Sequence, residues 1–227
     1  MAARPLTIGW AFSAGPLLDL LIRAIPQVMK KFTAPLIRLA ALGVGLGLTS
    51  APALEPAHDP ASLWSFDLET ASLWRVSRNT FVDYVVLPQI ISLRTPAHFR
   101  LGLGDGELTI RSRFSLLLEA IPVGPEMGYF GFSASPSIEY WFPGHATAIY
   151  ASIGGGFGYI DSTDVPGGQG QDFTLNWFAS AGVRHYFRPD FSLNAGVMFQ
   201  HWSNGGATDP NPGLDALGPV LGVSWTF

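Results

Sequence analysis

Two residues near the C-terminus, His201 and Ser203, have the types and the spacing of a base and a nucleophile. From Phe191 to Phe199 every odd-numbered residue but Ala195 is large and apolar, and the same parity continues into His201 and Ser203. Residues two apart in an extended strand lie on one face. Burial alone gives no reason for a His and a Ser on an apolar face. A neutral imidazole there can take the proton of the Ser203 hydroxyl as it attacks an ester carbonyl.

The last strand supplies a third candidate, Asp215, by the same parity. Its apolar residues, from Leu217 to Phe227, again fall mainly on odd-numbered positions, and Asp215 precedes them. Adjacent antiparallel strands would bring Asp215 near His201, where a carboxylate can hold the imidazole tautomer and stabilise the imidazolium. We therefore predict His201, Ser203 and Asp215 as catalytic residues.

Other polar residues give weaker signals. A His-x-Ser pair in a loop is usually only polar surface, so the strand parity decides the interpretation. His58, His98, His145 and His185 show no metal-ligand spacing, and we predict no metal and no cofactor. The aspartates at 161, 164 and 172 could hold Ca²⁺ but lack the order of an EF-hand. The Gly154–Gly156 run fits close packing in a sheet better than a phosphate loop, because no helix follows it.

The composition narrows the fold class. Of 227 residues, 48% are hydrophobic and 13% are charged, about half the usual ~25% charged. No run of eighteen apolar residues follows position 60, which argues against membrane helices there. The remaining classes are an apolar soluble sheet protein and a transmembrane barrel. The chain has no cysteine, which excludes disulfides and thiolate metal sites, and its net charge of −4 argues against nucleic acid as a partner.

Alternation favours the barrel: an all-β, eight-stranded antiparallel transmembrane β-barrel. In residues 171–187 most odd-numbered positions are apolar, whereas the even-numbered ones are mainly polar, small or charged. Eight strands enclose an interior filled by side chains, not a pore. We expect ion pairs there among Glu107, Arg111, Arg113, Glu119, Asp172 and Arg184. The predicted strands are 62–75, 80–94, 106–121, 126–142, 146–161, 171–187, 191–204 and 214–227.

The N-terminal region has the pattern of a secretory signal peptide. In residues 29–53 a basic stretch precedes ten apolar residues, Leu39–Leu48, and then small residues ending at Ala53. We predict residues 1–28 as a non-native or dispensable extension, 29–53 as a cleaved signal and 54–227 as the barrel. Export favours the outer membrane of a Gram-negative bacterium. The final Phe227 resembles the C-terminal signature of outer-membrane proteins that the barrel assembly machinery binds.

Residues 199–215 resemble the active-site stretch of the PagL-type lipid A 3-O-deacylases. The likeness is carried by the His-x-Ser-Asn cluster, the glycines and asparagine that follow, and the acidic residue fourteen positions after His201. The resemblance implies an eight-stranded barrel that removes the 3-linked hydroxyacyl chain from lipid A without a metal. It assigns His201 as the base and Ser203 as the nucleophile, and it places Asp215 where the family usually has Glu. Asn204, Gly206 and Asn211 match the oxyanion region.

Two alternatives belong to other functional classes. One is a non-enzymatic structural or adhesive barrel, which the Asp in place of Glu would fit. The other is an esterase acting on phospholipids of the outer leaflet. In all three cases the expected partners are membrane lipids, and lipid A or lipopolysaccharide is the leading one. The sequence leaves the acyl preference open, and also whether the barrel forms a homodimer.

Overall fold

A computed structural model of the chain describes residues 59–77 and 82–227, all within one compact unit, Pro52–Phe227. The predicted extension 1–28 and signal peptide 29–53 lie outside the described residues. No helix in the described part of the chain is long and apolar enough to cross a membrane.

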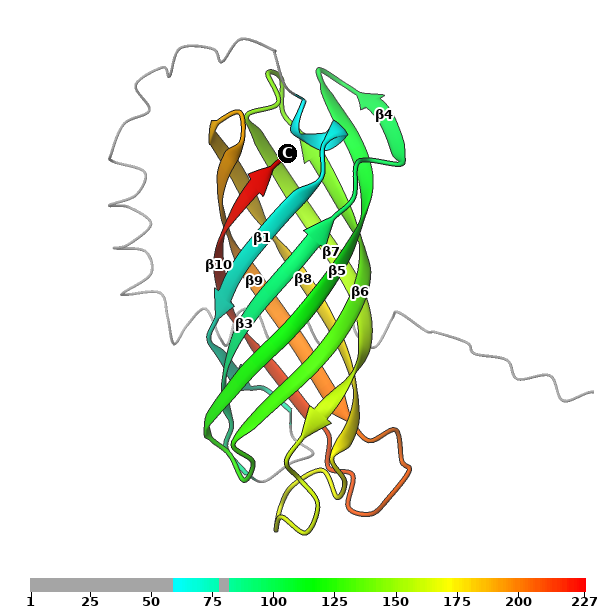
Figure 1. The fold of residues 1–227 in the computed structure, drawn as a ribbon, viewed down its shortest axis with the longest axis vertical. Helices are drawn as coiled ribbons and strands as arrows, with labels where there is room; N and C mark the ends of the chain where they lie inside the picture. Colours follow the sequence, from blue (N-terminus) through cyan, green and yellow to red (C-terminus); the bar gives the residue numbers. More distant parts are fainter. Residues whose placement is uncertain (1–58, 78–81) are drawn as a thin grey trace, which may run out of the picture. The chain divides into compact units, whose positions relative to one another are not determined.

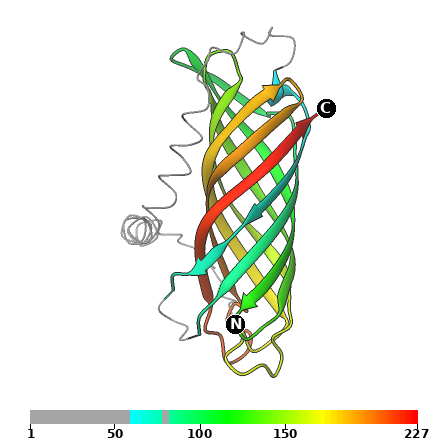
Figure 2. The ribbon, with the colours of Figure 1, turned by 90° about the vertical axis from the view of Figure 1, so that its left-hand side faces the viewer.

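The described residues form a closed antiparallel β-barrel (Figures 1 and 2). Ten strands are present, but β1 and β2 together make one wall strand and β4 pairs only with β5, so eight strands close the ring. Closure comes from β1, which pairs with β3 on one side and β10 on the other. The strands are β1 (Ser65–Ala71), β2 (Leu73–Arg75), β3 (Val85–Arg94), β4 (Phe99–Leu103), β5 (Gly106–Val123), β6 (Gly128–Trp141), β7 (Thr147–Ile160), β8 (Phe173–Arg188), β9 (Phe191–Ser203) and β10 (Leu214–Thr226).

The eight predicted strands are confirmed, and the differences lie at their ends. The first begins at Ser65, after a 3-10 helix at Pro60–Ser62, and is interrupted at Ser72. The second begins at Val85, with residues 80–81 outside the described chain. The connection at 95–105 contains a strand, β4, that the sequence analysis missed because it alternates over only five residues.

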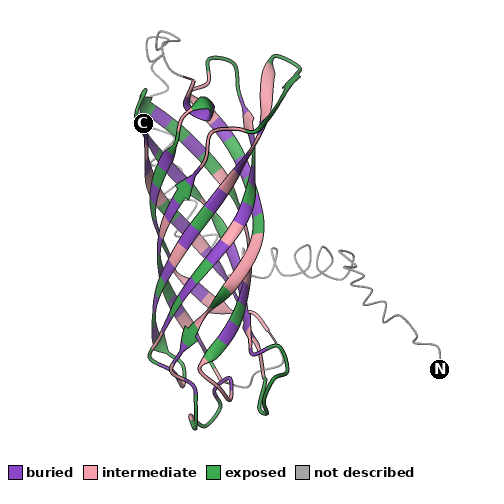
Figure 3. Cartoon of the chain, turned by 45° about the vertical axis from the view of Figure 1, so that its right-hand side comes forward, coloured by how far each residue is buried: buried purple, intermediate pink, exposed green. Residues whose placement is uncertain are grey.

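Burial alternates along the strands, with buried and exposed residues in turn (Figure 3). The outward residues of β5 to β10 are largely apolar, for example Phe132, Ile149 and Leu193, each at least 40% exposed. Aromatic pairs lie near both ends of the barrel, for example Phe66–Trp225 at the end that holds the C-terminus and Phe157–Phe173 at the other end. An apolar belt with aromatic residues at its edge is typical of transmembrane barrels.

The barrel interior is held by ion pairs centred on Glu139. Its Oε1 lies 2.7 Å from Arg94 NH1 and 2.9 Å from Arg184 NH1. Arg94 also binds Asp67 through Nε at 2.7 Å, and Arg113 binds Glu69. These side chains are almost completely buried, so each charge needs a partner to offset its lost hydration.

The predicted set of interior charges is partly wrong. Arg111, Arg113 and Arg184 are buried inside, as expected. Glu119 is inside too, but its partner is Gln200 Nε2 at 2.7 Å instead of an arginine. Glu107 on β5 pairs with Arg100 on β4, and Asp172, directly before β8, binds backbone N–H groups in a loop. Both lie at the ends of their strands, where their partners come from β4 and from a loop instead of from the barrel interior.

The Gly154–Gly156 run lies where neighbouring strands approach closely. A Cβ at Gly156 would overlap the carbonyl oxygen of Phe132 on β6, and one at Gly155 would lie 2.6 Å from Asn176 O on β8. The interpretation of this run as close packing is therefore confirmed.

We expect Gly156→Ala to destabilise the barrel, because its methyl group meets the backbone of β6, which cannot move without disturbing the hydrogen-bond ladder. Overpacking of this kind costs about 1–3 kcal/mol. Gly102→Ala on β4 is the control, since nothing lies within 4 Å of a Cβ there. Thermal unfolding in detergent should show a lower midpoint for Gly156→Ala only. Equal midpoints for the two variants would contradict this account.

Candidate active site

His201 and Asp215 form the centre of the candidate site. They are directly opposed across the β9–β10 ladder, and His201 Nδ1 lies 2.7 Å from Asp215 Oδ1. An ionised carboxylate only accepts hydrogen bonds, so Nδ1 carries the proton and Nε2 is left as the basic nitrogen. The shorter Asp reaches the imidazole because the two Cα positions face each other. The side chains are 26% and 21% exposed.

Ser203 lies two residues beyond His201 on the same outward face and is the last residue of β9. It is partly buried and pairs with Leu175 of β8. No hydrogen bond joins Ser203 to His201 in the described structure. Hydroxyl–imidazole bonds of this kind are often long before substrate binds. The structure therefore brings His201 and Asp215 into contact and leaves Ser203 beside them.

Aromatic and aliphatic side chains surround the pair. Trp177 of β8 faces His201 with ring centroids 5.8 Å apart, and it packs against Phe199 at 4.9 Å. Leu175, next to Ser203, is 45% exposed. The histidine thus has a carboxylate on one side and an apolar, outward-facing wall on the other. Such a wall suits an acyl chain that lies against the barrel.

The loop 204–213 connects the two strands of the site, and Asn204 organises it. Asn204 Nδ2 lies 2.7 Å from Gln169 O and 2.8 Å from Thr208 O, while its Oδ1 accepts from Gly206 N at 2.8 Å. The Asn204 backbone N–H donates to Asn211 Oδ1 at 3.0 Å. Two of the three predicted oxyanion residues, Asn204 and Gly206, thus already donate these N–H groups to other atoms of the two loops. Asn211 is exposed, and its Nδ2 makes no hydrogen bond to the described residues.

Two aspartates order the neighbouring loop 161–172. Asp172 Oδ1 accepts from Thr163 N at 2.7 Å and from Ser162 N at 3.0 Å. Asp161 accepts from Met127 N at 3.1 Å in the β5–β6 connection. The Thr163 N–H bond, followed by weaker contributions, lowers the pKa of Asp172 to about 2. Both carboxylates thus bind backbone N–H groups.

A second polar cluster lies beyond the other end of the strands. His145 Nδ1 is 3.4 Å from Asp59 Oδ1 and 4.0 Å from Glu107 Oε2. Arg100 already pairs with both carboxylates, at 2.6 Å and 3.0 Å. This cluster was not predicted from the sequence, because Asp59 and His145 lie far along the chain from the hairpin that holds Arg100 and Glu107.

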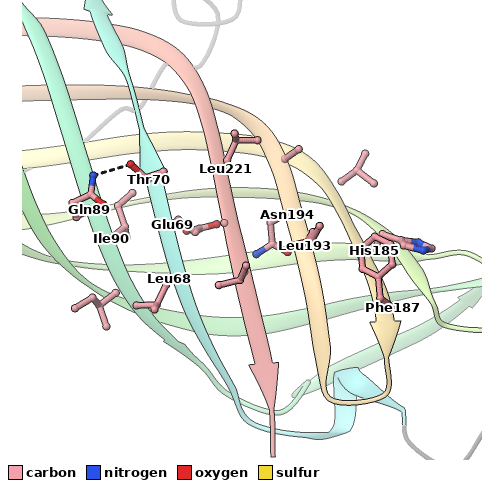
Figure 4. Close-up of a pocket in the computed structure, with 15 residues that line it drawn as sticks. Leu68, Glu69, Thr70, Gln89, Ile90, His185, Phe187, Leu193, Asn194 and Leu221 are labelled. Carbon is pink, nitrogen blue, oxygen red and sulfur yellow. Dashed lines mark hydrogen bonds between the residues drawn. The ribbon is translucent and has the colours of Figure 1, made fainter. Parts of the chain in front are cut away.

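The candidate site lies on the outward face of β9 and β10. A depression in the wall lies elsewhere, over β1, β3, β8, β9 and β10 (Figure 4). Leu68, Leu193 and Leu221 line it, and His185 lies at its edge. It contains none of the predicted site residues and lies toward the C-terminal end of β10, whereas Asp215 lies at the start of that strand.

Comparison with known proteins identified one family model, described as lipid A 3-O-deacylase (PagL), which matches residues 95–224. The comparison with curated proteins found no match.

The solved structures that match this chain include the following three. The outer membrane enzyme PagL is 17% identical, with 70% of this chain and 97% of that chain covered and a TM-score of 0.49. Neisserial surface protein A (NspA) is 14% identical, with 72% and 97% covered and a TM-score of 0.42. Ail, the attachment invasion locus protein of Yersinia pestis, is 13% identical, with 73% and 99% covered and a TM-score of 0.39.

We expect Asp172→Asn to destabilise the 161–172 loop at neutral pH, because an amide oxygen accepts the Thr163 and Ser162 N–H bonds less strongly than a carboxylate. The pKa of Asp172 in the folded protein is lowered from 3.8 to about 2. Its stabilisation is therefore complete above about pH 4 and is lost as the pH falls through 2. Thermal unfolding of wild type and variant should differ at pH 7 and converge near pH 2.

Asp164→Asn is the control for this experiment, since Asp164 is exposed in the same loop. A gap between wild type and Asp172→Asn that stays constant down to pH 2 would contradict the role of the carboxylate charge.

Proposed function

The chain belongs to the lipid A 3-O-deacylase (PagL) family, since the family model covers more than half of its length, and on this premise we propose that it hydrolyses the ester bond of the 3-linked hydroxyacyl chain of lipid A through Ser203, His201 and Asp215. The observation that carries the proposal is the 2.7 Å contact between His201 Nδ1 and Asp215 Oδ1 on the outward face of the barrel. A structural barrel has no need of a histidine oriented in this way among lipid-facing residues.

The reaction follows from the tautomer of His201. Nε2 takes the proton of Ser203 as Oγ bonds to the ester carbonyl carbon, and Asp215 stabilises the imidazolium that forms. When the intermediate collapses, the bond to the sugar oxygen breaks, and Nε2 returns the proton to that oxygen. Water, deprotonated by His201, then attacks the acyl-Ser203 ester; the bond to Ser203 Oγ breaks, Nε2 returns the proton to Oγ, and the free hydroxy fatty acid leaves. The proposed reaction uses no metal or cofactor.

Asn211 is our candidate for stabilising the oxyanion. Its Oδ1 is held by the Asn204 N–H, which directs the two Nδ2 hydrogens away from that bond. Preorganised donors at a developing oxyanion contribute on the order of 10²–10³ in kcat. Asn204 and Gly206 support the site by shaping the loop.

The location of the site is consistent with a lipid substrate in the outer leaflet. His201, Ser203 and Asp215 all lie at the barrel end opposite the C-terminus, which in an outer-membrane barrel faces the exterior. Lipid A resides in that leaflet. We propose this orientation, together with export through the signal at 29–53 and assembly guided by Phe227.

Ser203→Ala removes only the hydroxyl and keeps the strand. We expect the barrel to fold and to keep its heat-modifiable mobility on gels, while hydrolysis of lipid A falls by several orders of magnitude, because the nucleophile is lost. The measurement is the mass of lipid A from a host that expresses the variant. Wild-type deacylation by Ser203→Ala would exclude the serine mechanism and favour a water molecule activated by His201.

Asp215→Asn should lose most activity, because the amide cannot stabilise the imidazolium and can favour the wrong tautomer. In a protease triad the equivalent change lowers kcat by about 10⁴. Asp209→Asn is the matched control, since Asp209 is exposed in the adjacent loop, and it should remain active. Asp215→Glu, which has the family's usual acid, should also remain active. A dead Asp209→Asn with an active Asp215→Asn would show that Asp209 is the orienting acid.

The same assay separates the alternative functions. Loss of one 3-hydroxyacyl chain from lipid A supports the proposal. Unchanged lipid A with a folded barrel in the outer membrane supports a structural role. Release of fatty acid from phospholipid, with lipid A intact, supports a phospholipid esterase.

A further inference from the structure

We infer that Glu126 is a positioning residue for the proposed site, acting through Gln169 and Asn204. The inference rests on the proposed function. In that proposed site the strands position the reacting side chains, whereas a loop positions Asn211, and the inference concerns what holds this loop.

Glu126 is a buried carboxylate that joins three segments outside the strands. It lies in the β5–β6 connection, and its side chain is surrounded by neutral donors. Tyr84 OH donates to Oε2 at 2.6 Å, and Ser162 Oγ donates to Oε1 at 2.8 Å. The backbone N–H of Gln169 also donates to Oε1, at 3.2 Å. Burial, together with the bond to Glu126, raises the pKa of Tyr84, so its phenol stays protonated as a donor.

Gln169 passes this connection to the site loop through its backbone. Its N–H donates to Ser162 Oγ at 2.5 Å and, over a longer distance, to Glu126 Oε1, and its carbonyl oxygen accepts from Asn204 Nδ2 at 2.7 Å. Gln169 is fully buried and Asn204 is 4% exposed, so water does not readily replace either bond. Asn204 is the residue directly after Ser203. Glu126, in the β5–β6 connection, is thus linked through Gln169 to Asn204, the neighbour of Ser203.

Asn204 in turn orients Asn211 and the end of the loop. Its N–H binds Asn211 Oδ1, and the loop ends at Gly213, where a Cβ would lie 3.5 Å from His201 Cε1. His201 and Asp215 themselves are held by the β9–β10 ladder and do not depend on Glu126. Loss of Glu126 should therefore disturb Asn211 and leave the His201–Asp215 pair intact.

This separation predicts a kinetic signature. Glu126→Ala removes the acceptor of the Tyr84 and Ser162 hydroxyls and leaves the Gln169 N–H with Ser162 Oγ alone, so the loop 161–172 holds Asn204 less firmly. We expect kcat to fall about 10- to 100-fold, the size of a misplaced catalytic group. KM should change little because Glu126 is buried away from the outward face that holds His201 and Ser203, and the pH profile of kcat/KM should keep its shape. Glu126→Gln keeps one acceptor oxygen and should restore most of the activity.

The experiment uses the full chain in detergent with purified lipopolysaccharide as substrate. Release of hydroxy fatty acid is normalised to the folded fraction from heat-modifiable mobility. Ser162→Ala removes both a donor to Glu126 and an acceptor of the Gln169 N–H, and it tests the network even where Glu126→Ala folds poorly; it should lower kcat moderately. Glu107→Ala, a carboxylate at the other end of the barrel, is the control and should match wild type.

Proteolysis of the loop 204–213 provides a readout independent of catalysis, and Glu126→Ala should be cleaved there faster than wild type. The inference is overturned if folded Glu126→Ala has the wild-type kcat. If Glu126→Ala does not fold, an unchanged kcat in Ser162→Ala overturns it. Cleavage of the loop 204–213 at the wild-type rate in Glu126→Ala also overturns it. Ser203→Ala is assayed in parallel: its full activity would refute the proposed mechanism, and the cleavage rates would still decide whether Glu126 orders the loop.

Discussion

Closure of the backbone hydrogen-bond ladder is the constraint on which the rest of this structure depends. Within hydrocarbon each unpaired N–H or C=O costs several kcal/mol, so a sheet can cross a membrane only without edges. Here β1 removes the edge by pairing with both β3 and β10. A closed wall has only an inside and an outside, and strand geometry assigns successive residues to them in turn. Each later feature follows from that assignment.

The two faces have opposite chemistry because they meet different surroundings. Inside, eight strands leave too little room for a pore, and buried arginines pair with Asp67, Glu69 and Glu139. Outside, aliphatic and aromatic side chains face lipid. A histidine bound to an aspartate is out of place on the outer face unless the molecule it acts upon is itself in the membrane. The position of the pair on the outer face is therefore a stronger argument for a lipid substrate than the identity of the two residues.

The candidate site divides into a part held by strands and a part held by loops. His201 and Asp215 face each other across a regular ladder, which fixes their distance and allows an Asp to stand where the family usually has Glu. Asn204 and Asn211 depend instead on hydrogen bonds between loops that are distant in sequence. In the mechanism we propose, the first part sets the base and its tautomer, and the second sets the donors around the carbonyl.

The sequence by itself determined the strand count, the outward parity of His201, Ser203 and Asp215, and the close packing at Gly154–Gly156. These depend on alternation along single strands, a local property. The break at Ser72, the strand β4, the partners of Arg94 and Glu119, and the link from Glu126 to Asn204 were decided only by the tertiary structure. Apart from β4, whose alternation is too short to recognise, they depend on residues far apart in the chain, such as Gln200 and Glu119, which are 81 positions apart. Such contacts depend on the register between strands and on how the loops pack once the barrel closes, which residue order alone does not specify.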